Sequence, residues 1–161
     1  MGEGYMWECP KCKYKFRANV GMGFSYWDVY AKTFEKARLG GFGKELKETL
    51  KNHPNAVIDP TDGVYRCTSC GELAAEPILT VYIPKGEEQC ATASVRSVAK
   101  AYMTPNEMEW YFDLRVEYNH RCKRCGGRMV TVHIKFEEKK DGLLCPDCKT
   151  PLRRTSSIEW D

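Results

Sequence analysis

Cysteine is the residue type in this sequence with the clearest capacity for chemistry. Eight of the nine cysteines form four Cys-x-x-Cys pairs, which begin at Cys9, Cys67, Cys122 and Cys145. One such pair can hold two thiolates on a tight turn, and two pairs together offer four soft sulfur ligands to a tetrahedral metal ion. Paired spacing of this kind is typical of zinc sites, whereas disulfide frameworks belong mainly to small secreted proteins. The sequence therefore predicts two Zn²⁺ ions per chain, each held by four cysteines.

The four pairs can combine as sequence neighbours or in a nested order. Nested order would join the like sequences CPKCK and CPDCK at one site, and RCTSCG and RCKRCG at the other. Neighbouring order closes shorter loops, which costs less chain entropy. We therefore expect neighbours to share a metal ion, with the ligands divided into Cys9, Cys12, Cys67 and Cys70 at one site and Cys122, Cys125, Cys145 and Cys148 at the other.

Cysteine at every ligand position leaves no open coordination position for water or a substrate. Catalytic zinc usually keeps such an open position, and structural zinc does not. Both predicted sites are therefore expected to be structural. Iron is the alternative metal, because four thiolates also suit a rubredoxin-type redox centre.

The composition is that of a folded intracellular protein. The chain has 161 residues, of which 42% are hydrophobic, enough for the core of one ordinary domain or two small ones. Its first residues, Met1–Pro10, show no basic segment followed by an apolar one. No apolar run approaches the roughly 18 residues that span a bilayer. We expect a cytoplasmic location and no membrane partner.

The formal net charge of +3 changes once the predicted metal sites are counted. A Zn²⁺ ion bound by four thiolates is a unit of charge −2, so two such sites would bring the chain to about −1. A nearly neutral protein has no overall electrostatic attraction for nucleic acid.

Helical spacing marks the long stretch between Cys12 and Cys67, where residues of about 17–63 are predicted to form an insertion. The first predicted helix covers about Tyr26–Leu39 and carries an apolar stripe of Trp27, Tyr30, Phe34 and Ala37. The second covers about Lys44–Asn52, with an apolar pair at Leu46 and Leu50. Turn residues predict a loop over the stretch that follows, Asn55–Val64.

Alternating apolar residues predict strands around the later cysteine pairs. Both Tyr111–Tyr118 and Met129–Phe136 alternate, and we expect them to pair antiparallel around the pair that begins at Cys122. A strand rich in β-branched residues is predicted at Ile78–Ile83, and a short final strand at Thr150–Ile158.

The stretch from Cys122 to Cys148 resembles a zinc ribbon of the rubredoxin-like kind, and Tyr65–Ile83 resembles the second half of another. The resemblance covers about half of the chain and implies one structural zinc ion in each ribbon. The implied fold class is α+β, with two zinc ribbons of short antiparallel strands and a helical-hairpin insertion in the first. The expected domains are residues 1–84 for the first ribbon with its insertion, 85–109 for a linker or helix, and 110–161 for the second ribbon.

Basic residues gather around the cysteine pair that begins at Cys122. With Trp110, Tyr111 and Tyr118 nearby, they could bind nucleic acid through phosphate contacts and ring stacking. The alternative is that these cations donate toward the negative metal centre and solvate its turn. The cluster consists of His120, Arg121, Lys123, Arg124 and Arg128.

Binding is the class of function that the sequence favours, because it contains no catalytic triad, acid–base pair or cofactor fingerprint. We predict a zinc-binding adaptor that contacts another protein, with nucleic-acid binding as the alternative. An enzyme is the less favoured third class and would use Cys90, which has no histidine close in sequence to act as its base. His120 and His133 flank the later site and are candidate supporting groups or alternative ligands, with a surface position expected for His133.

Overall fold

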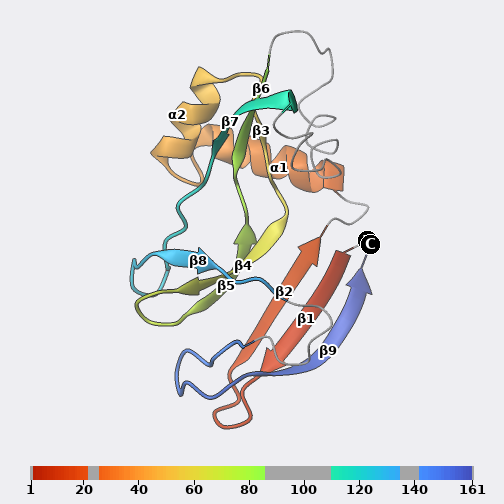
Figure 1. Ribbon diagram of the computed structural model, residues 1–161, viewed down its shortest axis with the longest axis vertical. Helices are drawn as coiled ribbons and strands as arrows, with labels where there is room; N and C mark the ends of the chain where they lie inside the picture. The colour runs from red at the N-terminus through yellow and green to blue at the C-terminus, as the bar shows by residue number, and fades with distance from the viewer. Residues whose placement is uncertain (1, 22–25, 86–109, 135–141, 161) are drawn as a thin grey trace. The chain divides into compact units, whose positions relative to one another are not determined.

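The computed structural model describes residues 2–21, 26–85, 110–134 and 142–160 (Figure 1). The chain divides into two compact units, and each draws on segments that are far apart in sequence. Unit 1 consists of Met1–Phe24, Thr61–Pro77 and Asn119–Asp161. Unit 2 consists of Ser25–Pro60 and Ile78–Tyr118.

The first sheet of unit 1 brings both ends of the chain together. It has three antiparallel strands in the order β2-β1-β9, with β1 at Gly2–Glu8, β2 at Lys15–Gly21 and β9 at Arg153–Trp160. The central strand β1 pairs with β2 through the turn that holds the first cysteine pair. On its other side β1 pairs with β9 from Gly2↔Trp160 to Glu8↔Arg153. The predicted final strand, Thr150–Ile158, is present as β9, which begins and ends later, at Arg153 and Trp160.

The second sheet of unit 1 repeats this plan. Its order is β5-β4-β8, with β4 at Asp62–Cys67, β5 at Leu73–Pro77 and β8 at Met129–Thr131. In each sheet, the last residue before the first cysteine pair is opposite a residue of the third strand. That residue lies eight positions after the first cysteine of the second pair. These partners are Glu8↔Arg153 and Arg66↔Val130. The two sheets therefore have the same strand plan in the same register.

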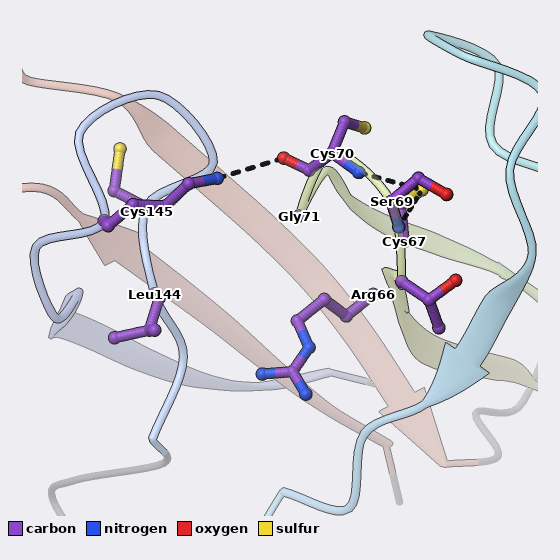
Figure 2. A pocket seen from close by; sticks show the side chains of 9 residues that line it. Arg66, Cys67, Ser69, Cys70, Gly71, Leu144 and Cys145 are labelled. Carbon is purple, nitrogen blue, oxygen red and sulfur yellow. Dashed lines mark hydrogen bonds between the residues drawn. The ribbon is translucent and has the colours of Figure 1, made fainter.

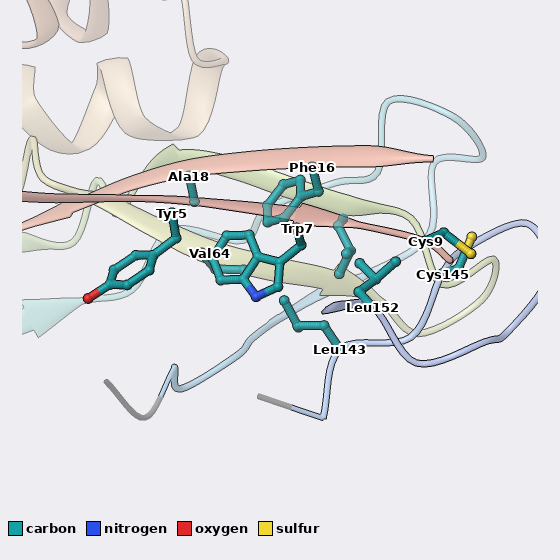
Figure 3. Close-up of a cluster of buried hydrophobic side chains, with 10 residues drawn as sticks. Tyr5, Trp7, Cys9, Phe16, Ala18, Val64, Leu143, Cys145 and Leu152 are labelled. Atoms are coloured by element: carbon teal, nitrogen blue, oxygen red, sulfur yellow. The ribbon is translucent and has the colours of Figure 1, made fainter. Parts of the chain in front are cut away.

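The core of unit 1 is shared by its two sheets (Figure 3). Tyr5 and Trp7 point inward from alternate positions of β1, as the two-residue period of a strand requires. Trp7 is 1% exposed and stacks on Phe16 with ring centroids 5.4 Å apart. The second sheet adds Val64 and Leu73 to the same cluster. Burying aromatic side chains on this scale supplies much of the hydrophobic stabilisation of so small a body.

Unit 2 contains both helices and a third small sheet. The helices are α1 at Tyr26–Leu39 and α2 at Lys44–Asn52, as predicted. The sheet has the order β3-β6-β7, with β3 at Val57–Ile58, β6 at Val81–Pro84 and β7 at Phe112–Val116. Helix α1 ends at Leu39, and the residue that follows, Gly40, has a φ of 93°, in the left-handed region. The Gly40 and Gly41 N–H groups donate to the carbonyls of Ala37 and Lys36, the bonding of a Schellman cap.

The apolar stripe predicted for α1 is correct for Tyr30 and Ala37, which are buried together with Tyr26. Trp27 differs, since 46% of its surface is exposed. The line of buried residues runs through Tyr26 and Tyr30, and Trp27 lies one residue, about 100° of helix rotation, away from it. In α2 the predicted apolar pair of Leu46 and Leu50 is buried.

The predicted pairing of the strands on either side of Cys122 is wrong. Strand β7 pairs with β6, and Phe112 packs on Tyr82 with ring centroids 5.6 Å apart. Strand β8 pairs with β4 instead. Alternation specifies which face of a strand is apolar, but it does not specify the partner strand. The predicted strand Ile78–Ile83 begins later, at Val81, and the predicted loop Asn55–Val64 contains β3 and the start of β4.

The described part of the chain is thus a mixed α/β protein with two helices and three small antiparallel sheets. The predicted linker or helix at 85–109 lies almost wholly outside the described residues, so the division into 1–84, 85–109 and 110–161 stays a prediction. None of the helices in the described segments has the length and apolar character needed to cross a membrane.

Candidate metal centres

The structure places all eight predicted ligands in two clusters within unit 1. Site A consists of Cys9, Cys12, Cys145 and Cys148, and site B consists of Cys67, Cys70, Cys122 and Cys125. In each cluster the sulfur atoms all lie within 4.8 Å of one another. The predicted combination of neighbouring pairs is therefore wrong, and the pairs combine in nested order.

The physical reason is the weak dependence of loop entropy on loop length. Doubling a loop costs only about 0.6 kcal/mol more, so the longer loops of the nested order are a small penalty. The hydrogen bonds between β1 and β9 bring Cys9 to Cys145. Those between β4 and β8 bring Cys67 to the pair that begins at Cys122. Strand pairing and core packing outweigh the entropy difference that favours neighbours.

The sulfur–sulfur distances fit a tetrahedral metal ion. In site A the distances are 3.4 Å for Cys9–Cys148 and 3.7 Å for Cys12–Cys148. In site B they are 3.5 Å for Cys67–Cys125 and 3.7 Å for Cys70–Cys122. A tetrahedron with metal–sulfur bonds of about 2.3 Å has edges of about 3.8 Å, whereas a disulfide bond measures about 2.0 Å. All eight thiols are free, so the clusters are suited to metal ions and not to disulfides.

All four cysteine pairs adopt one backbone turn. The N–H of the first cysteine donates to the carbonyl five residues later, in Tyr14, Glu72, Gly127 and Thr150. The carbonyl of the first cysteine accepts from the N–H four residues later, and that residue has a positive φ. The values are 64° for Lys13, 81° for Gly71, 74° for Gly126 and 59° for Lys149. Glycine adopts this region without strain, and the two lysines adopt it within site A.

Backbone N–H groups in these turns point at sulfur and favour the thiolate. The Cys70 and Ser69 N–H groups lie 3.5 and 3.4 Å from the Cys67 sulfur. Hydrogen bonding from Cys70, opposed by desolvation, lowers the pKa of Cys67 to about 6. Hydrogen bonds from the Thr150 hydroxyl and backbone lower the pKa of Cys148 to about 6. At a second cysteine of each site, the backbone hydrogen bonds of Tyr14 and Gly127 are outweighed by hydrogen bonds among the sulfurs, which raise the pKa of Cys12 and Cys125. The thiolate is thus favoured at one position of each site and opposed at another when no metal is bound.

Gly127 allows the two turns of site B to approach each other. A Cβ atom at Gly127 would lie 2.7 Å from the Ser69 hydroxyl oxygen and 3.1 Å from the Cys67 sulfur. We predict that Gly127→Ala lowers the zinc affinity of site B by about tenfold, as displaced ligand supports do in other metal sites. Competition with a chelating dye measures the change.

Gly126→Asn is the matched control for Gly127→Ala. A Cβ at Gly126 meets no atom within 4 Å, and asparagine tolerates the positive φ of this position. Equal zinc affinities for the two variants would contradict the steric role of Gly127.

The predicted basic cluster divides into residues that form ion pairs and residues that form none within the described part of the chain. Lys123 forms an ion pair with Glu76. Arg124 donates to Glu72 and to Asp147, at 3.1 Å in each case. Arg121 and Arg128 are exposed and face each other across an antiparallel bridge. The four candidate residues thus surround site B, but two of them are already bonded to acids.

His120 and His133 lie outside both clusters of sulfur ligands. His120 is 5% exposed, and its ring lies over Tyr65 with centroids 4.0 Å apart. Its Nδ1 atom is 3.3 Å from Glu76 Oε2, so it supports the carboxylate that also binds Lys123. His133 is exposed, as predicted. Cys90 lies outside the described residues.

Sequence reasoning missed four residues that connect the turns: Tyr14, Glu72, Asp147 and Lys149. Each lies within two positions of a cysteine ligand. Their positions beside the cysteine pairs were a signal, because a polar side chain on such a turn can reach a neighbouring turn. Their partners could not be identified before the arrangement of the turns was known.

A pocket of about 390 Å³ lies between the turn at Cys67 and the turn at Cys145 (Figure 2). Arg66, Leu144 and Lys149 line it together with cysteines of both sites. No protein-family model, no curated protein and no solved structure matches the chain. What is inferred about function therefore rests on the two cysteine clusters and the side chains around them.

Proposed function

We propose that sites A and B each bind one structural Zn²⁺ ion and that the protein is a zinc-stabilised binding protein. The observation that carries this proposal is the donor set: four cysteine sulfurs at tetrahedral spacing in each site, with no position left for water. A closed site of this kind supplies folding energy and no catalysis.

The strand plan supports a double zinc ribbon. Strands β1, β2 and β9 would form an outer ribbon around site A, and β4, β5 and β8 an inner ribbon around site B. The common turn geometry and the common register of Glu8↔Arg153 and Arg66↔Val130 support two copies of one architecture. In this proposal the inner ribbon is inserted within the sequence of the outer one.

Metal content tests this part of the proposal. Protein purified under reducing conditions is expected to be colourless and to release about two zinc ions per chain, since each site has four thiolates. Elemental analysis and a thiol-reactive reagent that liberates the metal give the count. Coloured protein that contains iron would contradict zinc, and one metal ion or none would contradict the pair of sites.

A closed metal site leaves the surface to carry the function, and we propose that α1 contacts a protein partner. Trp27, Ala31 and Phe34 follow one another at helical spacing; the first two are exposed and Phe34 is half-buried. Trp27 exposes 46% of its surface, so a large apolar side chain is left in contact with water. Tryptophan is enriched among residues that dominate binding at protein interfaces.

A second candidate function is nucleic-acid binding, and the arginines beside site B favour it. Arg121 faces Arg128, and Arg66 of β4 lies diagonally across from Arg128, the residue that precedes β8. No ion pair joins any of these three to an acidic residue in the described segments. Like charges placed opposite one another destabilise a sheet unless an anion binds between them. Phosphate groups would be such anions.

One capture experiment separates the two candidates. With the adaptor function, a specific protein is expected to bind the immobilised chain, to be lost with Trp27→Ala and to be kept with Leu39→Ala, a control at an exposed residue of the same helix. With the nucleic-acid function, captured material is nuclease-sensitive and binding weakens with salt. An Arg121→Gln/Arg128→Gln variant is then expected to reduce the slope of log K against log salt concentration by about 2, the loss of two phosphate contacts. Lys11→Gln serves as the charge control. Capture that all variants leave unchanged would exclude both surfaces.

A further inference from the structure

The two metal sites are connected by side chains that stand next to their ligands. Arg124 directly precedes Cys125 of site B, and its Nη1 atom donates to Asp147 Oδ1 at 3.1 Å. Asp147 directly precedes Cys148 of site A. This ion pair therefore joins a ligand turn of one site to a ligand turn of the other.

A second connection runs in the opposite direction. Lys149 directly follows Cys148 of site A, and its Nζ atom donates to the carbonyl oxygen of Cys70, a ligand of site B, at 3.1 Å. The same ammonium group donates to the Pro146 carbonyl at 2.7 Å, so it is held by both turns. These turns form opposite walls of the pocket in Figure 2, where Cys70 and Cys145 are labelled.

Glu72 extends the connection to the remaining turn. It accepts a hydrogen bond from the same Arg124 Nη1 at 3.1 Å and another from the Tyr14 hydroxyl at 3.3 Å. Tyr14 closes the first turn of site A, because its carbonyl accepts the Cys9 N–H. The chain of contacts from Tyr14 through Glu72 and Arg124 to Asp147 thus reaches all four ligand turns.

The hydrophobic core connects the same two sites beneath these polar contacts. Cys9 and Cys145, both ligands of site A, are fully buried. They belong to one cluster with Val64 and Leu73, which flank the Cys67 pair in the strands β4 and β5 of site B. An ordered inner sheet therefore also orders side chains that pack against the site A ligands.

We propose that the two sites bind metal cooperatively, with Arg124 and Lys149 as part of the coupling. The inference rests on the proposed metal binding. A metal ion in one site orders its two turns. Ordering site A positions Asp147 to accept from Arg124 of site B, and ordering site B positions the Cys70 carbonyl to accept from Lys149 of site A. The first ion thereby bears part of the entropy cost of ordering the turns of both sites, and this raises the affinity of the second site. The coupling is reciprocal, because each ion must affect the other's affinity by the same factor.

The test is a titration of the metal-free full chain with chelator-buffered Zn²⁺, followed by native mass spectrometry. Two independent sites, equal or unequal, leave at least about half of the molecules singly loaded at half-saturation. Coupling of about 25-fold between equal sites would reduce that share to about one sixth, within the usual range of coupling strengths. A share of half or more, in a protein that binds two zinc ions at sites of similar affinity, would overturn the coupling alone. Fewer than two bound ions would overturn the proposed metal sites instead.

Variants that keep all eight cysteines test the two bridges. We expect Arg124→Gln and Lys149→Gln each to reduce the coupling by about two- to fivefold, as exposed charged contacts do. Lys123→Gln is the matched control, since Lys123 lies on the same turn but pairs with Glu76 of site B's own sheet. An Asp147→Asn variant alone and combined with Arg124→Gln completes a double-mutant cycle. Suppose that Arg124→Gln and Lys149→Gln each bind two zinc ions, keep the wild-type circular dichroism spectrum and show wild-type coupling. That result would show that Arg124 and Lys149 do not contribute to the coupling.

Discussion

Removing the proposed metal ions from sites A and B is expected to unfold unit 1. Structural zinc contributes about 10–16 kcal/mol per site in small zinc-binding peptides, whereas whole domains are stable by only about 5–15 kcal/mol. Cys9 and Cys145, candidate ligands of site A, are part of the same buried cluster as Trp7, so we expect the core to lose its packing when the proposed metal is removed. Amide hydrogen exchange in β1 and β4 is expected to rise to the rate of an unfolded chain.

The measurement compares protein treated with a strong chelator against protein treated with the same chelator saturated with zinc. Near-ultraviolet circular dichroism provides a second readout, because the stacked pair Trp7–Phe16 loses its fixed geometry on unfolding. Returning zinc should restore both signals. Unchanged exchange in β1 and β4, in protein shown to be free of metal, would rule out a structural role for the two ions.

Replacing Cys145 by serine is expected to release the beginning of the chain. Cys145 is fully buried in site A, and serine supplies a shorter, harder oxygen that does not replace a thiolate ligand of zinc. Losing the metal should destabilise the outer sheet by more than about 4 kcal/mol, the range reached when a structural metal is lost. Because β1 depends on site A, exchange should rise most in Gly2–Glu8 and Arg153–Trp160, at the two ends of the sequence.

Cys122→Ser is the matched comparison for Cys145→Ser. It removes a ligand of site B, so its largest effect is expected in β4 and β8. If neighbouring pairs shared a metal ion, the two variants would destabilise the same C-terminal strands and leave β1 protected. The same exchange pattern for both variants, with β1 protected, would therefore contradict the nested arrangement.

Local features of the fold could be predicted because they depend on nearby residues. The helix bounds Tyr26–Leu39 and Lys44–Asn52 followed from apolar spacing, glycine and proline, and the structure has the same bounds. The turn at each cysteine pair is also local, since its hydrogen bonds join residues at most five positions apart. The donor set of eight cysteines and the absence of an open ligand position were likewise readable from spacing alone.

Long-range partners could not be predicted in the same way. Tyr111–Tyr118 has clear alternation, yet its partner is β6 and not the strand that follows Cys122. Glu72 and Arg124 gave no sign of their ion pair, because they lie on turns of two pairs separated by the whole of the 78–118 segment. Alternation and charge describe what a segment can bind, and many segments satisfy the same requirement.

The sequence by itself determined that the chain carries four turns that can each offer two thiolates to a metal, because a Cys-x-x-Cys turn is made within six residues. The tertiary structure alone decided which turns come together to form one group of four sulfurs. Pairing of β1 with β9, and burial of Trp7 against Leu143 and Leu152, join the first turn to the last. The entropy that favours neighbouring turns grows only with the logarithm of loop length, so the hydrogen bonds and buried area of the folded sheets outweigh it.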